Sequence, residues 1–433
     1  MMGQSFAFTD IENNWYKNSI KGLEKQEFIN GFDNGEFLPE DKTTRAEILK
    51  IIMNTAGSEV YESGTQCFTD VSTDAWFNKY ICAGVNQEIT KGYEDGKFKP
   101  GGNVTVLETL AFAVRAFDID LNYLGEGDTW FQKYQAYADQ KNIIKKHAYT
   151  VNTLVSRGQA ADIILKMQKV KAGQELDNKS DGCFDFKGMK SGEYTADIKG
   201  VTRKYLLYVP ENVSADSQKG LIVAFHGRTN DNEMVRNYMK MGGGGYSRNG
   251  YQNDYIVAYP AGVGNGPYSW SQIESIEFFD AIITQISENL CVNRDAVFSV
   301  GHSLGSYMSN KTSCLRGDVI RGMVGVASNG YDGDCTGPVS SLITHLPGDP
   351  LSPYTAGERA YSLKSENNLC EPQTAPLEFG DLRGCQQKTS CSLGNTVIFC
   401  NAYDVYGGDQ HSWPKSGADE MRDFFTNIED YTK

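Results

Sequence analysis

The spacing of apolar residues changes along the chain and divides it into two parts. Over residues 1–170, apolar residues recur at helical spacing within short segments. Over residues 183–433, short apolar runs alternate with amphipathic stretches such as QIESIEFFDAIITQISENL (272–290). Strands that alternate with helices are typical of a parallel sheet with helices on both faces. The pattern therefore predicts an all-α module followed by an α/β domain with a mostly parallel sheet.

Several apolar runs of the second part have the length and flanks of buried strands. The stretch before them, KVKAGQELDNKSD, is polar and lacks apolar periodicity, so we interpret residues 171–182 as a linker. The strands are expected at residues 203–210, 220–227, 254–262, 296–303, 322–330, 341–349 and 396–403.

The first part contains an internal repeat. GFDNGEFLP at 31–39 recurs as GYEDGKFKP at 92–100, and a weaker third copy begins at Trp130 without this glycine-containing segment. Each copy predicts a helix after a tryptophan and then, in the first two copies, a turn in which glycine adopts positive φ. A second helix follows, opened by a capping box. The boxes are Thr44-x-x-Glu47, Thr105-x-x-Glu108 and Ser156-x-x-Gln159, in repeats of about 5–58, 65–120 and 127–170.

Composition narrows the class of partner and the compartment. The net charge is −14 and no basic cluster offsets it, so nucleic acid is not an expected partner. No apolar run is long enough to span a membrane, and MMGQSFAF lacks the pattern of a signal peptide. The ten cysteines are dispersed, without a Cys-x-x-Cys pair. We interpret them as disulfides formed in an oxidising compartment, against the alternative of free buried thiols.

The motif GHSLG at 301–305 carries the chemistry. It fits Gly-x-Ser-x-Gly, directly after a predicted strand and before a helical stretch, as in the nucleophile elbow of α/β-hydrolases. The glycines permit a turn too tight for side chains, and the serine hydroxyl is exposed at the edge of the sheet. Ser303 is therefore the expected nucleophile.

The base follows nearly by elimination, because the histidine comes after the serine in this fold. His345 lies inside a predicted strand, where we interpret it as a core residue. His411 lies in the loop GGDQHSWP after the last predicted strand, where an imidazole can reach the nucleophile. We therefore expect His411 to be the base, among the five histidines His147, His226, His302, His345 and His411.

The acid that orients the base is expected in the loop after the preceding strand. Asp349, in SLITHLPGDPLSPY, lies there and would accept the second imidazole N–H. Asp404 and Asp409 are rivals, but both lie on the histidine's own loop and suit a surface role better.

An oxyanion hole requires two backbone N–H groups. One is expected from Leu304, after the nucleophile, and the other from Arg228, with Thr229 as the alternative. Trp270, Tyr307 and Trp413 are candidate walls of a substrate cleft, with Trp270 the expected exposed aromatic and core packing an equal alternative for the other two.

The first 170 residues resemble three S-layer homology repeats, with TRAE at 44–47 as the hallmark. The resemblance implies a helical module that anchors exported proteins to secondary cell-wall polymers. If glycan binding depends on the motif arginines, Arg45 and Arg157 remain, whereas the second copy has Val106. The alternative is a module that has lost its ligand and keeps only its helices.

Residues 183–427 resemble the feruloyl esterase and poly(3-hydroxybutyrate) depolymerase group of carbohydrate esterase family one, through RKYLLYVP, AFHG, YPAG, GHSLG, DPLSPY and HSWP. Ser306 stands where a second glycine is common, and Ser352 where valine is usual. The resemblance implies ester hydrolysis through an acyl-enzyme, without metal or organic cofactor.

The acyl group stays open among feruloyl-arabinoxylan, acetylated xylan and polyhydroxyalkanoate. A wall anchor suits an extracellular enzyme that attacks plant polysaccharide, so the two plant-wall esters are favoured over the polyhydroxyalkanoate, with feruloyl narrowly ahead of acetyl. A dead hydrolase scaffold in a surface-display or adhesion protein is the alternative of another class. A peptidase or acyltransferase on the same fold would share the acyl-enzyme chemistry.

Overall fold

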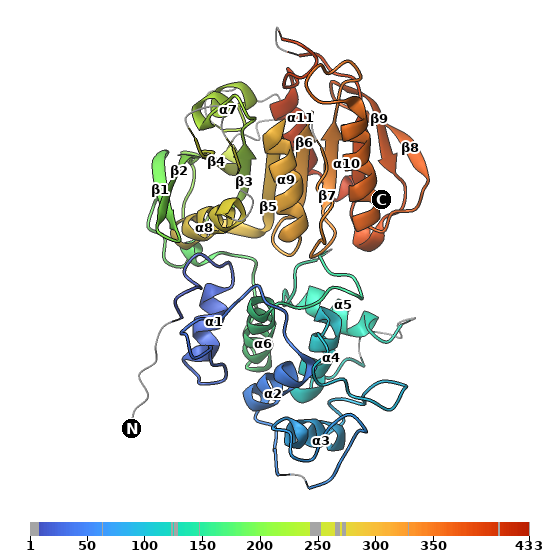
Figure 1. Cartoon of the computed structure of the whole chain (residues 1–433). Helices are drawn as coiled ribbons and strands as arrows, with labels where there is room; N and C mark the ends of the chain where they lie inside the picture. Colours follow the sequence, from blue (N-terminus) through green and yellow to red (C-terminus); the bar gives the residue numbers. More distant parts are fainter. Residues whose placement is uncertain are drawn as a thin grey trace. The chain divides into compact units, whose positions relative to one another are not determined.

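The protein is described by a computed structural model that divides into two compact units. One comprises residues 1–145 and 151–177, and the other residues 146–150 and 178–433 (Figure 1). Among the described residues, no helix is long and apolar enough to cross a membrane. His147 lies outside the described residues, which are 8–62, 64–122, 124, 129–146, 148–242, 253–264, 269–270, 274–327, 329–405 and 408–432.

The first unit consists of paired helices, two for each repeat. The second helix of every pair begins at a complete capping box, as predicted, in which hydroxyl and acid or amide satisfy exposed backbone N–H groups. The glycine turns also form as predicted, with Gly35 and Gly96 at φ of 83° and 73°. The helices are α1 Lys17–Glu24, α2 Arg45–Ala56, α3 Asn78–Asn86, α4 Val106–Ala116, α5 Gln132–Gln140 and α6 Arg157–Lys171.

The three repeats close on one another in a cycle. The first residue of each second helix donates its backbone N–H to another repeat: Arg45 to Gly102, Val106 to Thr153 and Arg157 to Asp41. Single β-bridges follow the same cyclic order, Thr44 with Asn103, Thr105 with Leu154 and Lys42 with Ser156. Each repeat is therefore bonded to the other two. A single copy would lack these neighbours and would bury too little apolar surface.

The expectation that Arg45 contacts a wall glycan is not supported, because its side chain is turned into the protein. It is 3% exposed, donates Nε–H to the Phe98 carbonyl at 2.9 Å and pairs with Glu108 at 2.7 Å. Arg157 makes the equivalent bond to the Phe37 carbonyl at 2.8 Å but stays half-buried, so glycan contact by Arg157 remains a prediction. The motif arginine thus binds the glycine turn of the next repeat.

The same geometry accounts for Val106. By the cyclic order, residue 106 faces the third repeat, to which its backbone N–H is bonded through Thr153. The third repeat lacks the glycine-turn segment whose carbonyl accepts the arginine elsewhere. An arginine at 106 would have lost its acceptor, and a buried apolar residue avoids that cost.

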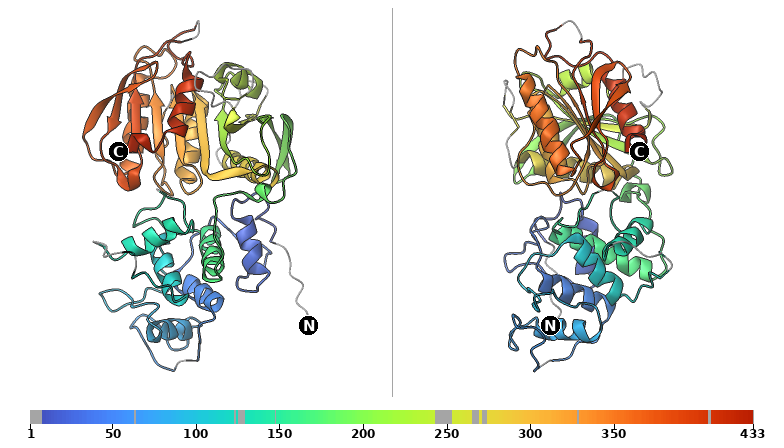
Figure 2. Two further views of the ribbon diagram at one scale, coloured as in Figure 1. Left: turned by 180° about the vertical axis from the view of Figure 1, so that it is seen from behind. Right: turned by 90° about the vertical axis from the view of Figure 1, so that its right-hand side faces the viewer.

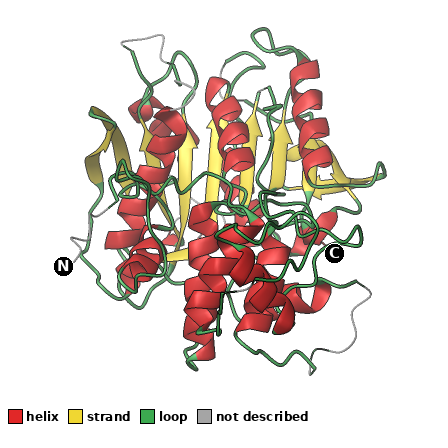
Figure 3. Cartoon of the chain, turned by 60° about the horizontal axis from the view of Figure 1, so that its bottom comes forward, coloured by secondary structure: helices red, strands yellow, loops and turns green. Residues whose placement is uncertain are grey.

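The second unit is built on one ten-stranded sheet in the order β1-β2-β4-β3-β5-β6-β7-β10-β9-β8. All strands of the described residues belong to this unit (Figure 3). The central six run parallel, and antiparallel strands flank them on both sides. The strands are β1 Gly192–Ile198, β2 Val201–Tyr208, β3 Lys219–Phe225, β4 Tyr255–Pro260, β5 Val292–His302, β6 Gly322–Val326, β7 Ser340–Thr344, β8 Thr374–Phe379, β9 Leu382–Lys388 and β10 Val397–Cys400.

Each of the strands predicted from apolar runs is present, and the three additional ones lie at the ends of the sheet. β1 and β8 largely alternate between exposed and partly buried positions, and β9 has only Leu382 and Cys385 buried, so none of the three has the continuous apolar run of a doubly covered strand. The two ends are therefore antiparallel pairs that the sequence pattern did not reveal.

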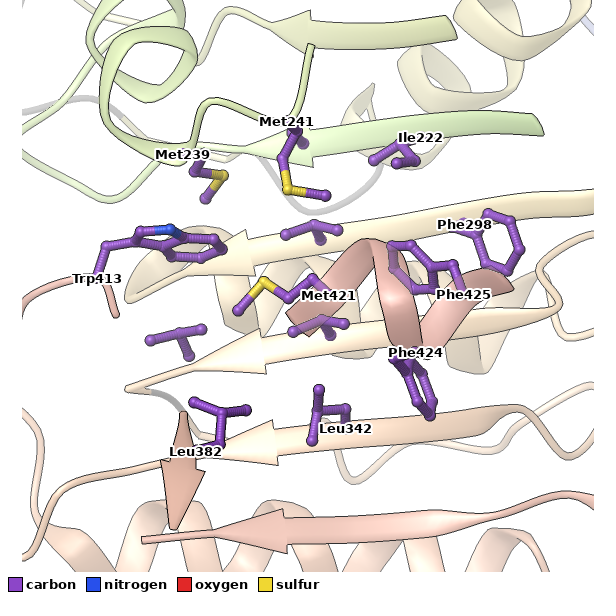
Figure 4. Close-up of a cluster of buried hydrophobic side chains, with 14 of the residues drawn as sticks. Ile222, Met239, Met241, Phe298, Leu342, Leu382, Trp413, Met421, Phe424 and Phe425 are labelled. Atoms are coloured by element: carbon purple, nitrogen blue, oxygen red, sulfur yellow. The ribbon is translucent and has the colours of Figure 1, made fainter. Parts of the chain in front are cut away.

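Helices cover both faces of the sheet, as predicted. Helices α8 Glu274–Asn289, α9 Leu304–Leu315 and α10 Tyr354–Asn367 lie on the face seen in Figure 1, and α11 Gly417–Thr426 lies on the opposite face (Figure 2). Helix α7, Asn232–Met239, shares the core cluster of α11. In that cluster Met421, Phe424 and Phe425 of α11 lie over the strands, together with Trp413 (Figure 4).

All ten cysteines are paired, which confirms the interpretation as disulfides. The predicted linker, residues 171–182, is shorter in the structure. Its last residues precede Cys183, which is bonded to Cys291, and they pack on the second unit. There the Ser180 hydroxyl donates to the Leu290 carbonyl at 2.9 Å. The remaining pairs are Cys67–Cys82, Cys314–Cys335, Cys370–Cys391 and Cys385–Cys400.

Candidate active site

Ser303 occupies a sharp turn between β5 and α9. Its φ and ψ are 55° and −123°, a conformation that L-residues rarely adopt. A Cβ on Gly301 would overlap the Gly305 carbonyl, and one on Gly305 would overlap the Phe225 carbonyl. Both glycines of the motif are therefore required by backbone packing, and the strand–turn–helix context predicted for the motif is present.

Ser306, where a second glycine is common, is accommodated by a glycine opposite. Ser306 is fully buried, and a Cβ added to Gly325 of β6 would lie 2.6 Å from its Oγ. Its hydroxyl has no hydrogen-bond partner among the described residues. The elbow thus packs closely with serine here because β6 provides a glycine at the contact.

His411 and Asp349 are hydrogen-bonded to each other. His411 Nδ1 lies 2.7 Å from Oδ2 and 2.9 Å from Oδ1 of Asp349, so the Nδ1–H donates and Nε2 is left as the acceptor. Burial raises the pKa of Asp349, but the backbone N–H of Ser352, the imidazole of His411 and the N–H of Leu351 outweigh it and hold the pKa below its ordinary value. The carboxylate is thus ionised wherever His411 acts as a base.

The rival carboxylates have other partners. Asp404 is exposed and pairs with Arg383 at 3.0 Å. Asp409 accepts the backbone N–H of His411 at 3.0 Å, so it shapes the loop that carries the imidazole. Only Asp349 contacts the His411 ring nitrogen among these three.

His345, which the sequence pattern placed in the core, lies against the same carboxylate. It follows β7, is fully buried, and its Nε2 lies 3.2 Å from Asp349 Oδ2 and 3.1 Å from the Ser352 carbonyl. Burial lowers the pKa of His345, so it is neutral near pH 7. The four-residue separation of His345 and Asp349 is the sequence feature that could have predicted this contact. Such a separation is common by chance, so it is weak evidence.

Ser303 and His411 both line one cavity of about 910 Å³. Leu304 and Arg228 line it too, as does Thr229, which leaves either of the last two as the second oxyanion donor. Within the described part of the chain, the backbone N–H groups of Leu304 and Arg228 donate to no protein acceptor. Such uncommitted N–H groups beside a serine can stabilise an oxyanion.

Two of the three aromatic residues expected at a cleft line this cavity, Tyr307 and Trp413. The expectation that Trp270 is an exposed aromatic is wrong, because it is 8% exposed and does not belong to the lining. Its indole N–H donates to the His226 carbonyl at 3.0 Å, and its ring packs on the His226 imidazole. Trp270 thus supports the loop that carries Arg228.

Comparison with known proteins gives two kinds of relative. A family described as "S-layer homology domain" matches residues 7–49 and 68–105. A probable feruloyl esterase C of Aspergillus niger is 31% identical over 47% of this chain and 75% of its own length. Feruloyl esterase D of Neurospora crassa is 26% identical over 54% of this chain and 82% of its own. The middle cell wall protein of Brevibacillus brevis is 29% identical over 32% of this chain and 13% of its own.

Two solved structures show a weaker likeness. An acetyl xylan esterase from Aspergillus awamori aligns with 54% of this chain and 99% of its own, at 13% identity and a TM-score of 0.40. A ferulic acid esterase from Anaeromyces mucronatus aligns with 60% of this chain and 100% of its own, at 13% identity and a TM-score of 0.36.

Proposed function

The chain belongs to the feruloyl esterase family, and we propose that it hydrolyses esters of plant cell-wall polysaccharide while attached to a bacterial cell surface. Feruloyl esters are the preferred substrate, ahead of acetyl esters on xylan. The observation that carries the proposal is the pairing of His411 with the buried Asp349 beside the cavity that holds Ser303.

Ser303, His411 and Asp349 act as nucleophile, base and orienting acid in this mechanism. The Ser303 hydroxyl attacks the ester carbonyl while His411 Nε2 takes its proton, and Asp349 stabilises the imidazolium. The backbone N–H groups of Leu304 and Arg228 bind the oxyanion. The protonated His411 then gives its proton to the sugar oxygen as the bond between that oxygen and the acyl carbon breaks, and an acyl-enzyme remains on Ser303. Water, activated by the same imidazole, releases the acid and restores the serine.

The cavity supports an aromatic acyl group over a small one. Its volume of about 910 Å³ falls in the range of sites that hold drug-sized ligands, far more than an acetyl group needs. Tyr307 and Trp413 offer ring surfaces in the lining, and Leu351, 73% exposed, adds an aliphatic one. A planar aryl ring can stack or pack on such surfaces.

The first unit supports attachment to the cell wall. It carries the match to the S-layer homology domain, and three complete capping boxes preserve its helices. The five disulfides suit an extracellular location. We therefore propose a secondary cell-wall polymer as the partner of this unit, with Arg157 available for contact.

The test is release of acid from methyl ferulate, acetylated xylan and a short-chain hydroxybutyrate ester, each with the parent and with Ser303→Ala. Release of ferulate that exceeds acetate and disappears in the variant is the expected result. A variant within tenfold of the parent would contradict the mechanism. Hydrolysis of the hydroxybutyrate ester alone would identify a depolymerase, and no release from any substrate would favour a non-catalytic surface protein.

A further inference from the structure

A buried histidine next to the nucleophile is bonded to the backbone of the base. His302 Nε2 lies 2.6 Å from the carbonyl oxygen of His411. A carbonyl oxygen can only accept, so Nε2 carries the proton and Nδ1 is the bare nitrogen of the ring. The tautomer of His302 is therefore set by the loop that carries the His411 imidazole.

The bare nitrogen meets a tyrosine from α7. Tyr238 Oη lies 3.2 Å from His302 Nδ1, and because Nδ1 has no proton, the hydroxyl donates. Burial raises the pKa of the Tyr238 hydroxyl, and the nearby backbone of Gly227 offsets part of that rise. A hydrogen-bonded chain thus runs from Tyr238 through His302 to the carbonyl of His411, and the backbone of Gly227 lies beside its Tyr238 end.

Each end of this chain adjoins a group that the proposed mechanism uses. Gly227 precedes Arg228, the proposed oxyanion donor, and His302 precedes Ser303. The far end is the backbone of His411 itself. Three loops that are distant in sequence are therefore joined by two side chains that do not belong to the triad.

The surroundings keep the chain in one protonation state. Burial lowers the pKa of His302 to about 4, so the imidazole is neutral over the range in which His411 acts. Trp413 packs on both rings, with centroids 6.1 Å from Tyr238 and 6.2 Å from His302. No alternative donor for Nδ1 is present among the described residues that contact it.

We propose that Tyr238 and His302 are positioning residues that hold the oxyanion loop, the nucleophile and the base in register for ester hydrolysis. The inference rests on the proposed function of the site. A displacement of about 1 Å among reacting groups costs about a hundredfold in rate, so two hydrogen bonds that set three loops control kcat. Both residues also line the cavity, but their polar atoms are bonded to each other and to the His411 carbonyl, so we expect the loss in kcat and little change in KM.

The test uses Tyr238→Phe, His302→Gln, His302→Leu and the double variant Tyr238→Phe with His302→Leu, each in the full chain. Tyr238→Phe is expected to lower kcat on methyl ferulate about tenfold, with KM within about twofold. His302→Leu is expected to cost more, and His302→Gln to recover part of the loss, because its amide can still donate to the His411 carbonyl. The double variant is expected to be no slower than His302→Leu, since the two groups act as one unit.

Tyr255→Phe is the matched control. Tyr255 is a buried tyrosine of the same unit, its hydroxyl bonds Thr426 at 2.7 Å, and it is not part of the cavity lining. It should lose stability as Tyr238→Phe does and keep the parent kcat. Equal activity of Tyr238→Phe and the parent, additive losses in the double variant, or a loss confined to KM would overturn the proposal.

A second readout separates this proposal from the proposed function. The rate at which a fluorophosphonate labels Ser303 depends on the nucleophile, base and oxyanion hole and needs no ester substrate. Slower labelling of Tyr238→Phe and His302→Leu, relative to Tyr255→Phe, supports the positioning role even if methyl ferulate is not hydrolysed. Unchanged labelling would overturn it, whereas loss of ester hydrolysis by the parent would overturn only the proposed function.

Discussion

At the scale of single residues, the role of the Asp349 carboxylate can be tested by comparing Asp349→Asn with a control variant. Asp349→Asn replaces an acceptor with a group that can no longer hold the Nδ1–H tautomer, so kcat on methyl ferulate should fall by about a thousandfold or more. Asp404→Asn is the control, because the exposed carboxylate of Asp404 pairs with Arg383 and not with His411, and this variant should stay near the parent rate. An Asp349→Asn rate within tenfold of the parent would mean that another group orients the base.

Lys364 provides a pH prediction at the same scale. Burial lowers the pKa of this lysine to about 7, and its Nζ lies 2.6 Å from Ser313 Oγ without an ion-pair partner among the described residues. The ordinary pKa is higher, so between about pH 10 and pH 7 the unfolded chain binds a proton that the folded one does not, and stability falls as pH falls. Lys364→Met removes this dependence.

The measurement is the free energy of unfolding of both proteins at pH 10, 8.5 and 7. The advantage of Lys364→Met over the parent should grow as the pH is lowered through this range and then level off below pH 7. A difference between the two proteins that does not change with pH would show that the amine is ionised inside the fold.

At the scale of elements, the elbow between β5 and α9 depends on backbone contact with β3. A methyl group on Gly305 would overlap the Phe225 carbonyl, so Gly305→Ala should shift the elbow or β3 and cost about 2 kcal/mol of stability. Activity should fall with it, because Ser303 and Leu304 adjoin this position. Gly192→Ala, where an added Cβ meets nothing within 4 Å, is the control in thermal unfolding and in kcat. Equal effects of the two changes would refute close packing at the elbow.

The packing of repeats makes a second prediction at this scale. Arg45→Met would leave the Glu108 carboxylate, 17% exposed, without its cation and should destabilise the first unit by about 3 kcal/mol. Lys21→Met breaks the exposed pair with Glu12 and should cost less than about 1 kcal/mol. Ester hydrolysis should be unaffected in both. Thermal unfolding followed by circular dichroism distinguishes them, and a harmless Arg45→Met would argue against the proposed role of the motif arginine.

At the scale of the whole molecule, each disulfide lies within one of the two units, and the candidate site lies entirely in the second. Residues 178–433 expressed alone should therefore keep kcat on methyl ferulate within about twofold of the full chain, since no group of the site is lost. The same fragment should fail to sediment with purified bacterial cell walls, whereas the full chain should sediment. A fragment that still sediments would assign wall binding to the esterase unit.

The parts of the fold and site that were predictable correspond to local patterns. Capping boxes, glycine turns and doubly covered strands are determined by residues close in sequence, so they could be recognised without tertiary structure. Ser303 was recognisable for the same reason, because the elbow is a local turn between a strand and a helix. The sequence pattern did not predict the edge strand β8, because its partly exposed positions form no apolar run.

The sequence by itself thus determined the two-part organisation, the central strands, the paired cysteines as a class and the residues that lie next to a local motif. Tertiary structure decided what depends on distant partners: the burial of Trp270 and Arg45, the contact of His345 with Asp349 and the chain through Tyr238 and His302. The physical reason is that a side chain's exposure and hydrogen-bond partner depend on which distant backbone folds against it. Residues that are close in sequence do not specify that distant neighbour.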